Sequence, residues 1–495
     1  MSAVHDASNS AIQLYDVLII GGGVVGSAIL RACTLLGWSC ALVEANADLL
    51  SNASGSNSGI ACTGVDASPG TLERALIRDS ISQIRMFCRE HNIPNRECGS
   101  LVCQWPWDGV ETSVMEDKDE ENGTKCSTSV DDVGQLGVTP PLVRVLTESW
   151  DAGDTHAKMM TAAQLKRMEM NLCNDSEGAV HIPGEIVVDP WLYSIALAVH
   201  ARENGGTIYT NFCFDAERSF FDATTKMWTV FRRRDHQNND SDTENEEDSE
   251  GESLSSSPSA DRPDTIQART IVNAAGIQAD LLQSATGDCP KPSWEARPRR
   301  GQYRIFSSNA ETKITHPIQP VPSQRTKGIF VFSTLYDQIV VGPTALDQES
   351  RTDRTADPEV ATTLTEHVKR LIPKLDPETA HVGEYVGIQP GTDHRDYQIM
   401  MYPEKNWVVA AGIRSTGLTG SLGIGRHVTQ LLKSILPNPE PKKTIKTTPL
   451  PNVQELVAEY QFRGDEMVTI HGNLYRVTHP ITKFGWEKQT GIAKI

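Results

Sequence analysis

The chain has 495 residues, of which 38% are hydrophobic, and a formal net charge of −18 at pH 7. This length predicts a globular protein of two or three domains, and the acidic balance argues against a nucleic-acid-binding protein, which needs basic patches. Residues 240–252 hold eight acids and no base, so much of the charge is local and is typical of a solvated loop.

The cysteines and the N-terminus restrict the class of protein further. The ten cysteines contain no C-x-x-C pair, which argues against a metal or iron–sulfur centre and favours a reducing compartment. Residues 1–13 carry no Lys or Arg and no apolar core, so no signal or transit peptide is recognised. No apolar run is long enough for a transmembrane segment. A cytoplasmic location is therefore expected, with peripheral membrane association left open.

The first predicted elements form a strand–turn–helix–strand unit. Apolar residues at 17–20 and 40–43 predict two buried parallel strands, and the apolar stretch 27–36 between them predicts a helix. The second strand ends on an acid, Glu44. This order is typical of the first βαβ unit of a dinucleotide-binding domain.

A G-x-G-x-x-G motif occupies the turn of this unit. Gly21 permits the tight turn, Gly23 lets the backbone approach a pyrophosphate, and Gly26 lets the helix pack closely on the strand. The helix N-terminus favours phosphate groups, and a carboxylate at the second strand end can accept hydrogen bonds from ribose hydroxyls. The alternative is an ordinary glycine turn that binds nothing. The predicted cofactor contacts here are Gly21, Gly23, Val24, Val25, Gly26 and Glu44.

The following segments alternate between ordered elements and polar insertions. Residues 45–68 are polar and glycine-rich, which predicts a long loop over the cofactor. A helix to about residue 91 and a strand at 100–104 follow. The charged segment 108–136 predicts a flexible insertion, and the low-complexity segment 234–264 predicts a disordered acidic loop.

The second half of the chain supplies more strands. Residues 270–276 form a second apolar strand that ends on small residues. Alternating apolar residues with Pro and Asp at the turns predict an antiparallel sheet from 303–306, 329–333 and 338–341. The strand 407–411 then leads through a glycine-containing turn into a helix that ends near residue 432.

These elements predict a discontinuous cofactor domain that is interrupted by a substrate domain. The predicted cofactor domain comprises residues 14–104, 185–290 and 381–436, and the substrate domain comprises 105–184 and 291–380. Residues 437–495 form a C-terminal extension to which the sequence assigns no role. An active site is expected at the domain interface.

Over about residues 15–435, the chain resembles the FAD-dependent oxidoreductases of the D-amino-acid-oxidase superfamily. Within them it is most similar to the branch of glycerol-3-phosphate dehydrogenases and L-2-hydroxyglutarate oxidases. Besides the βαβ unit, the motifs that carry the resemblance are 56–59 with 69–72, 272–276, 298–303, 341–345, and 411–415 with 417–419. The resemblance implies an α/β fold, α+β overall, with a Rossmann-like FAD-binding domain and an inserted, mainly antiparallel β substrate domain.

The resemblance also implies where FAD lies. Residues 54–64 would run beside the isoalloxazine ring, and residues 414–419 would meet its pyrimidine edge. A helix N-terminus there would stabilise the negative charge of the reduced flavin. The alternative is a strand-to-helix turn capped by Ser415 or Thr419, which requires no flavin. The implied cofactor contacts are Ser56, Asn57, Ser58, Gly59, Ala275, Gly276, Gly412, Arg414, Ser415, Thr416, Gly417, Leu418 and Thr419.

Two positions depart from the pattern of this branch. Relatives usually carry His where this chain has Cys62, and Arg where it has Gln389. A thiol could attach flavin or accept a proton if its pKa were lowered; the favoured alternative is that Cys62 only packs there. Gln389 can hydrogen-bond a substrate but carries no charge.

Other residues are candidates for the missing functions. His394 could serve as the base and Arg395 could bind an anion, although a polar turn with mutual ion pairing explains both equally well. Family position places Arg300 and Tyr303 at the domain junction, whereas Arg299 is expected to be a solvated charge. The predicted catalytic residues are Cys62, Arg300, His394 and Arg395, and the predicted substrate contacts are Gln389 and Tyr303.

The leading functional hypothesis is an FAD-dependent dehydrogenase or oxidase that transfers hydride from a small anionic hydroxy compound to flavin N5. Glycerol 3-phosphate is the first substrate predicted, followed by L-2-hydroxyglutarate or another 2-hydroxy acid, and then an amino acid. The changes at Cys62 and Gln389 motivate an alternative, a flavin-binding scaffold without turnover. Residues 54–64 and 270–276 argue against a nicotinamide-dependent dehydrogenase. The electron acceptor (oxygen, quinone or a protein) is left open.

Overall fold

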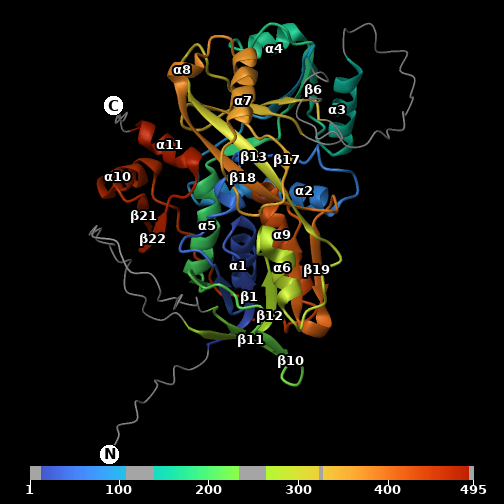
Figure 1. Cartoon of the computed structure of the whole chain (residues 1–495), viewed down its shortest axis with the longest axis vertical. Coiled ribbons are helices and arrows are strands. Elements are labelled where there is room, and N and C mark those ends of the chain that lie inside the picture. Colours follow the sequence, from blue (N-terminus) through green and yellow to red (C-terminus); the bar gives the residue numbers. More distant parts are fainter. Residues whose placement is uncertain (1–12, 108–138, 234–262, 323–326, 490–495) are drawn as a thin grey trace, which may run out of the picture.

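The computed structural model describes residues 13–107, 139–233, 263–322 and 327–489. Two large sheets lie one above the other in Figure 1, the first in the lower half and the second in the upper half. The predicted flexible insertion and nearly all of the predicted acidic loop lie outside the described residues.

The first sheet is the predicted Rossmann-like sheet. Its central strand β1 (Gln13–Ile20) pairs in parallel with β2 (Cys40–Val43) on one side and with β12 (Thr265–Asn273) on the other. Two more parallel strands flank these, namely β9 (Thr207–Tyr209) beside β2 and β20 (Trp407–Ala411) beside β12. Antiparallel edges are formed by β10 (Phe220–Asp222), β11 (Met227–Phe231) and β19 (Gln398–Tyr402).

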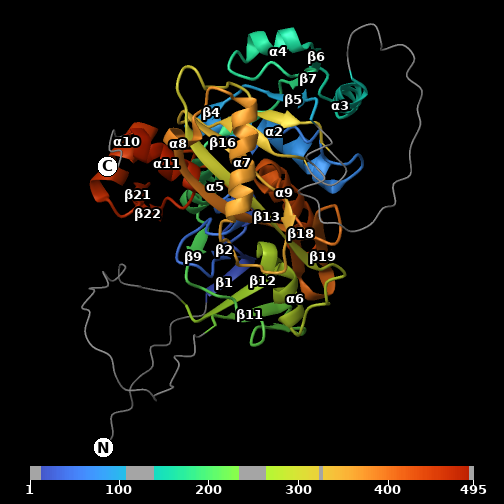
Figure 2. The same ribbon diagram turned by 45° about the horizontal axis from the view of Figure 1, so that its top comes forward.

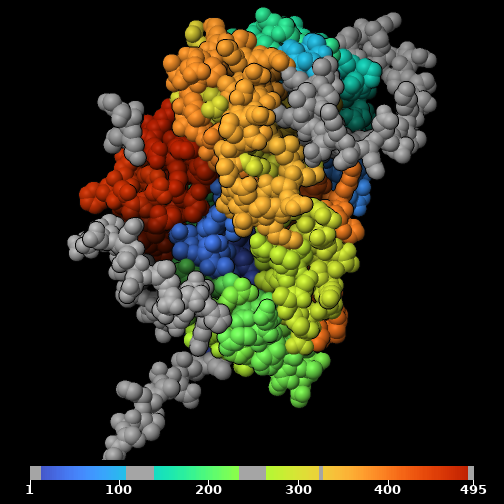
Figure 3. Space-filling model, in the orientation of Figure 1, coloured from blue at the N-terminus to red at the C-terminus, as the bar shows by residue number. Residues whose placement is uncertain are grey.

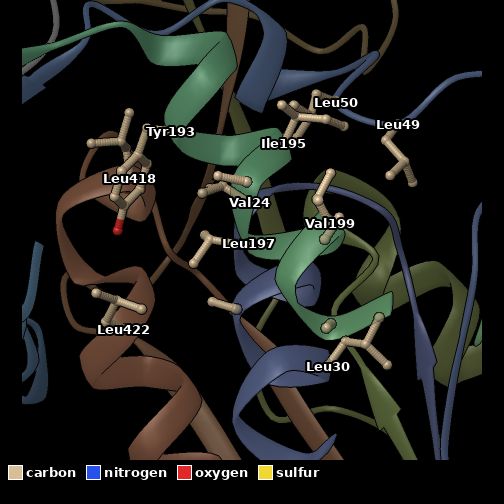
Figure 4. Close-up of a cluster of buried hydrophobic side chains, with 14 of the residues drawn as sticks. Val24, Leu30, Leu49, Leu50, Tyr193, Ile195, Leu197, Val199, Leu418 and Leu422 are labelled. Carbon is tan, nitrogen blue, oxygen red and sulfur yellow. The ribbon is translucent and has the colours of Figure 1, made fainter. Parts of the chain in front are cut away.

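Helices cover one face of this sheet. There α1 (Val24–Leu36) packs against α5 (Pro190–Glu203) and α9 (Gly417–Leu432), and α9 also packs on α2 (Leu72–Glu90). Figure 4 shows apolar side chains of α1, α5 and α9, among them Val24, Leu197 and Leu418, meeting in this core. The helix α6 (Ala279–Ala285) follows the short 3₁₀ turn Gly276–Gln278.

The second sheet is mostly antiparallel, as predicted. Its long strands β13 (Ala296–Ser307) and β18 (His381–Thr392) pair along most of their length. The remaining strands are β17 (Leu346–Asp347), β16 (Gln338–Gly342), β15 (Phe330–Ser333), β14 (Ile318–Pro320), β5 (Ser100–Gln104), β7 (Gly178–Ile182) and β6 (Lys158–Met160). Its helices are α3 (Pro140–Asp151), α4 (Ala162–Met168), α7 (Pro358–Leu371) and α8 (Pro377–Ala380), and Figure 2 shows α7 lying across the sheet.

A small third sheet links the two halves. It consists of β3 (Ile60–Ala61), β4 (Asn95–Arg96) and β8 (Ile186–Val188). The fold class predicted from the sequence is therefore confirmed, but two strands lie outside their predicted domain. Strands β5 and β18 were expected in the cofactor domain and instead pair within the second sheet. Their partners are distant in sequence, so local patterns did not reveal the pairing.

The C-terminal extension forms a compact addition on one side of the molecule (red in Figure 3). It contains α10 (Val453–Arg463), a hairpin of β21 (Met467–Ile470) and β22 (Asn473–Arg476), and α11 (Pro480–Gln489). Its Trp486 ring packs edge-on against Trp191 of α5, with ring centroids 5.9 Å apart, and both side chains are fully buried. No helix among the described residues is long and apolar enough to cross a membrane.

Candidate active site

A cavity of about 1530 Å³ lies where the two sheets meet. Its walls come from the turn between β1 and α1, the loop after β2, the facing parts of β13 and β18, and the beginning of α9. Pockets for one small ligand usually measure about 300–1,000 Å³. The cavity therefore has room for a dinucleotide together with a small second molecule.

The glycine motif forms the floor at one end of the cavity. A Cβ atom on Gly26 would lie 1.9 Å from the carbonyl oxygen of Gly21, so only glycine permits this close return of the chain. Gly21 itself has φ +111°, and its Cβ would lie 2.4 Å from the oxygen of Ala274 at the end of β12. Gly21, Gly23, Val24 and Val25 line the cavity, whereas Gly26 supports the turn from behind.

The acid at the end of β2 is held by its surroundings. Glu44 lines the cavity, and its two carboxylate oxygens accept hydrogen bonds from the backbone N–H groups of Gly22 (2.7 Å) and Asn46 (2.8 Å). Since a carboxylate has about four lone-pair sites, acceptor capacity for ribose hydroxyls is left. These bonds also fix the orientation of the carboxylate.

The loop after β2 runs along the cavity wall. Ser56, Asn57 and Ser58 line the cavity, and Asn57 shapes the loop because its side-chain oxygen accepts the N–H of Gly59 at 2.8 Å. Gly59 does not line the cavity. It has φ +72°, and its Cβ would lie 2.7 Å from the oxygen of Val188.

The beginning of α9 forms another part of the cavity wall, beside the first turn of α1. All seven predicted residues from Gly412 to Thr419 line it, as do Ala275 and Gly276. The helix is capped by neither Ser415 nor Thr419: its N-cap residue is Thr416, whose side chain makes no capping bond and instead donates to the Glu73 carboxylate at 2.7 Å. The side chain of Thr416 therefore caps none of the first N–H groups of α9. A helix terminus that binds a ligand requires N–H groups that are free in this way.

The predicted thiol, Cys62, lies on the cavity wall beside α9. Its N–H points to the hydroxyl of Thr419 at 3.3 Å. Burial, and secondarily the nearby carboxylate of Asp66, raises the pKa of the Cys62 thiol to about 12. The thiol is therefore protonated at neutral pH, which does not suit it to act as a base or a nucleophile.

Sequence reasoning missed an ion pair next to this thiol. Nζ of Lys327 lies 2.6 Å from a carboxylate oxygen of Asp66, and both residues line the cavity. Burial lowers the pKa of Lys327, but the attraction and hydrogen bond of Asp66, together with Cys62 and Glu73, outweigh burial and raise the pKa above its usual value. Lys327 is therefore a fixed positive charge on the cavity wall. A lone lysine among polar residues gives no sequence signal for such a role.

Glu73 is a second carboxylate that the sequence did not single out. It is buried in the first turn of α2, lines the cavity and accepts the hydroxyl of Thr416. The hydroxyl of Tyr397 lies 2.7 Å from the same threonine oxygen. The beginnings of α2 and α9 are joined in this way at the cavity wall.

Strand alternation separates the two neighbouring arginines of β13. Arg299 and Tyr303 line the cavity, whereas Arg300 does not; it lies 3.9 Å from Asp353. Successive side chains of a strand point to opposite faces, and Arg299, expected to be a solvated charge, is the arginine on the cavity side, where it pairs with Asp347 at 2.7 Å. The expectation for Arg299 is corrected accordingly.

The remaining predicted residues lie around the rim. Gln389 lines the cavity opposite Arg299 in the β13–β18 ladder. His394 and Arg395 also line it but are exposed, and Nε2 of His394 lies 3.4 Å from the carbonyl oxygen of Ser293. The carboxylate of Asp396 accepts the first N–H groups of α2 at 2.8 and 2.9 Å. Asp396 is therefore held by the N-terminus of α2, and not by the ion pairing within the turn that the alternative interpretation predicted.

The family model for FAD dependent oxidoreductases (DAO) matches residues 16–431 of the chain. The chain belongs to this family. Apart from the first residues of β1, residues 16–431 contain both large sheets, so the match covers the elements that line the cavity. The protein is accordingly an FAD-dependent oxidoreductase.

Individual relatives of this DAO-family chain are distant. It is 24% identical over 432 residues to a glycerol 3-phosphate dehydrogenase of Caloramator mitchellensis, which covers 87% of this chain and 76% of the relative. It is 24% identical over 426 residues to a glycerol 3-phosphate oxidase of Mycoplasma pneumoniae, and the aligned part covers 85% of this chain and 95% of the relative. An L-2-hydroxyglutarate dehydrogenase of Nematostella vectensis is 23% identical over 337 residues, and the aligned part covers 67% of this chain and 62% of the relative.

A solved structure shows the same fold. The L-α-glycerophosphate oxidase of Mycoplasma pneumoniae with FAD bound superposes with a TM-score of 0.70 at 22% identity, covering 89% of this chain and 100% of that chain. The cavity of the present DAO-family protein fits FAD on its own geometry. It offers a side-chain-free turn, the N-terminus of α1, where the N–H of Val24 donates to the hydroxyl of Ser54 at 2.9 Å, and a fixed carboxylate at Glu44.

The high pKa of Cys62 leads to a prediction about flavin attachment. We expect FAD to be released when this DAO-family protein is denatured with acid, because a protonated thiol does not form a covalent bond with the flavin. The visible spectra of the supernatant and the pellet after precipitation report this directly. Yellow colour that stays in the wild-type pellet but leaves the pellet of Cys62→Ser would contradict the expectation.

Proposed function

We propose that the protein oxidises a small anionic hydroxy compound, with glycerol 3-phosphate as the first candidate. The observation that carries this proposal is the Lys327 ammonium, which Asp66 fixes on the cavity wall beside Cys62. A fixed cation in a partly desolvated wall attracts an anionic group more strongly than a solvated one does. Relatives usually carry Arg where this chain has Gln389, and Lys327 supplies positive charge in its place.

The share of this chain that aligns with each relative favours glycerol 3-phosphate over a 2-hydroxy acid. The relatives named for glycerol 3-phosphate cover 85–87% of this chain, whereas the one named for L-2-hydroxyglutarate covers 67%. L-2-Hydroxyglutarate is therefore the second candidate. Both compounds carry an anionic group and an oxidisable hydroxyl, so both suit a site with a fixed cation.

The residues of the cavity divide the work of this reaction. FAD, when bound, supplies the hydride acceptor. Lys327 binds the anionic group, and the side-chain amide of Gln389 offers hydrogen bonds to uncharged oxygens of the substrate. The carboxylate of Glu73 is a cavity-wall group that suits the hydroxyl proton, whereas Asp66 is engaged by Lys327 and His394 lies exposed at the rim.

Anaerobic reduction of the bound flavin tests the proposal. Glycerol 3-phosphate should bleach the visible absorbance of the purified holoprotein, while glycerol, which has the same hydroxyls but no phosphate, should bleach it far more slowly. Faster bleaching by L-2-hydroxyglutarate would overturn the choice of substrate. A flavin that stays oxidised with both anions, and with a panel of other hydroxy acids and amino acids, would overturn the proposed reaction.

A further inference from the structure

The C-terminal extension lies outside the residues that match the family, which end at residue 431. It nevertheless contacts the loop that follows β2. Residues of this loop, from Asn52 to Ser58, line the cavity, so the extension stands directly behind part of the cofactor wall. The relevant segment of the extension is 476–486.

The first contacts hold the beginning of the loop. Nε of Arg476 lies 3.1 Å from a carboxylate oxygen of Asp48, and the hydroxyl of Thr478 lies 3.4 Å from the carbonyl oxygen of Leu50. The N–H of Leu50 in turn donates to the carbonyl oxygen of Gly22 in the glycine motif at 3.1 Å. Leu50 therefore connects the extension to the glycine turn that would receive the pyrophosphate.

The second contacts involve His479, whose side chain is fully buried. Burial lowers the pKa of His479 to about 3, so its ring is neutral, and its Nδ1 accepts the N–H of Ile481 at 3.2 Å. Its connection to the loop runs through Tyr385, whose hydroxyl donates to the carbonyl oxygen of Asn57 at 3.1 Å. The Tyr385 ring lies 5.9 Å from His479 and stacks at 4.5 Å on Tyr303, which lines the cavity.

Further along, the extension is fastened to both halves of the molecule. The hydroxyl of Thr482 donates to the buried carboxylate of Asp189, at the start of α5, at 3.0 Å. Tyr336, in the turn between β15 and β16, donates to the same carboxylate at 2.6 Å and accepts the indole N–H of Trp486 at 3.0 Å. The segment therefore cannot move away from the loop without breaking buried polar contacts.

We propose that the C-terminal extension is part of the FAD site, with Arg476, Thr478 and His479 as positioning residues. They hold the loop and the Tyr385–Tyr303 pair in the arrangement that receives the cofactor. The loop is otherwise polar and glycine-rich, so fixing it before binding lowers the entropy that FAD must remove. FAD affinity then depends on a segment that the family match does not include.

Variants of the full-length chain test this role. Apoprotein of Arg476→Ala and of His479→Gln is titrated with FAD by calorimetry, and the melting temperature of each apoprotein is measured. We expect the dissociation constant to rise on the order of tenfold, about 1.4 kcal/mol, in both variants. Arg476→Lys, which keeps the charge, should recover part of the affinity. Arg476 is partly exposed, so its replacement leaves the core intact.

Phe462→Ala is the matched control, because this residue belongs to the extension and is 92% exposed. It should leave the dissociation constant unchanged. If Arg476→Ala and His479→Gln lower the melting temperature of the apoprotein while FAD binds as tightly as in the wild type, the extension is only a stabilising element and the proposal fails. Because the readout is cofactor binding, this outcome is independent of which substrate the enzyme oxidises.

Discussion

Replacing Gly26 with alanine should abolish FAD binding. The new Cβ would lie 1.9 Å from the backbone oxygen of Gly21, a distance that no side-chain rotation can relieve. The turn between β1 and α1 must therefore open, which moves the N-terminus of α1 away from the pyrophosphate position. We expect the affinity for FAD to fall more than about a hundredfold, equivalent to about 2.7 kcal/mol.

Calorimetric titration of the apoprotein with FAD measures this loss. Gly287→Ala is the matched control, since no atom lies within 4 Å of the added methyl group. Its affinity should equal that of the wild type. Far-ultraviolet circular dichroism distinguishes a folded variant that has lost FAD from an unfolded one. A folded Gly26→Ala protein that binds FAD as the wild type does would show that the turn tolerates the methyl group.

The second large effect is expected at Lys327. Lys327→Met should lower kcat/KM for glycerol 3-phosphate by a hundredfold to a thousandfold, on the order of the cost of breaking a partly buried ion pair. The variant loses the cation that attracts the substrate and leaves the Asp66 carboxylate without it. FAD binding should persist, because the glycine turn and Glu44 are untouched.

Steady-state kinetics with glycerol 3-phosphate, after confirmation that the variant is yellow, measures the effect. Lys374→Met removes a lysine that is 62% exposed and pairs with Glu311, so it controls for the change in net charge. Lys327→Arg keeps the positive charge and should retain more activity than Lys327→Met. Equal kcat/KM in the wild type and Lys327→Met would show that Lys327 does not bind the substrate.

Local patterns in the sequence were sufficient for the cofactor half of the fold. The strand–turn–helix–strand unit was predicted because its hydrophobic periods and its glycines have short-range causes. The antiparallel sheet was predicted from alternation and turn residues. Strands β5 and β18 were assigned to the cofactor domain. Local patterns could not show that they belong to the second sheet, because their partner strands lie far away in the sequence.

The reactive end of the site was harder to predict for the same reason. Asp66 and Glu73 lie close together in the sequence, just before and at the beginning of α2, but Lys327 lies far along the chain and meets them only in the folded protein. Choosing between Arg299 and Arg300 requires knowing which face of β13 meets the cavity, and a shift of one residue exchanges the two. The packing of the C-terminal extension depends on Trp191 and Tyr336 elsewhere in the chain, which its own sequence does not reveal.

The position of β1 has a consequence for biosynthesis. This strand is synthesised first, yet one of its two neighbours in the sheet is β12, and the adjoining helix α1 is covered by α9 near the end of the matched region. Contacts between segments so distant in sequence form slowly. The apolar unit of β1, α1 and β2 is therefore synthesised long before β12 and α9. The cofactor site is therefore complete only after α9 has been synthesised, and until then the exposed apolar surface of this unit is prone to aggregation.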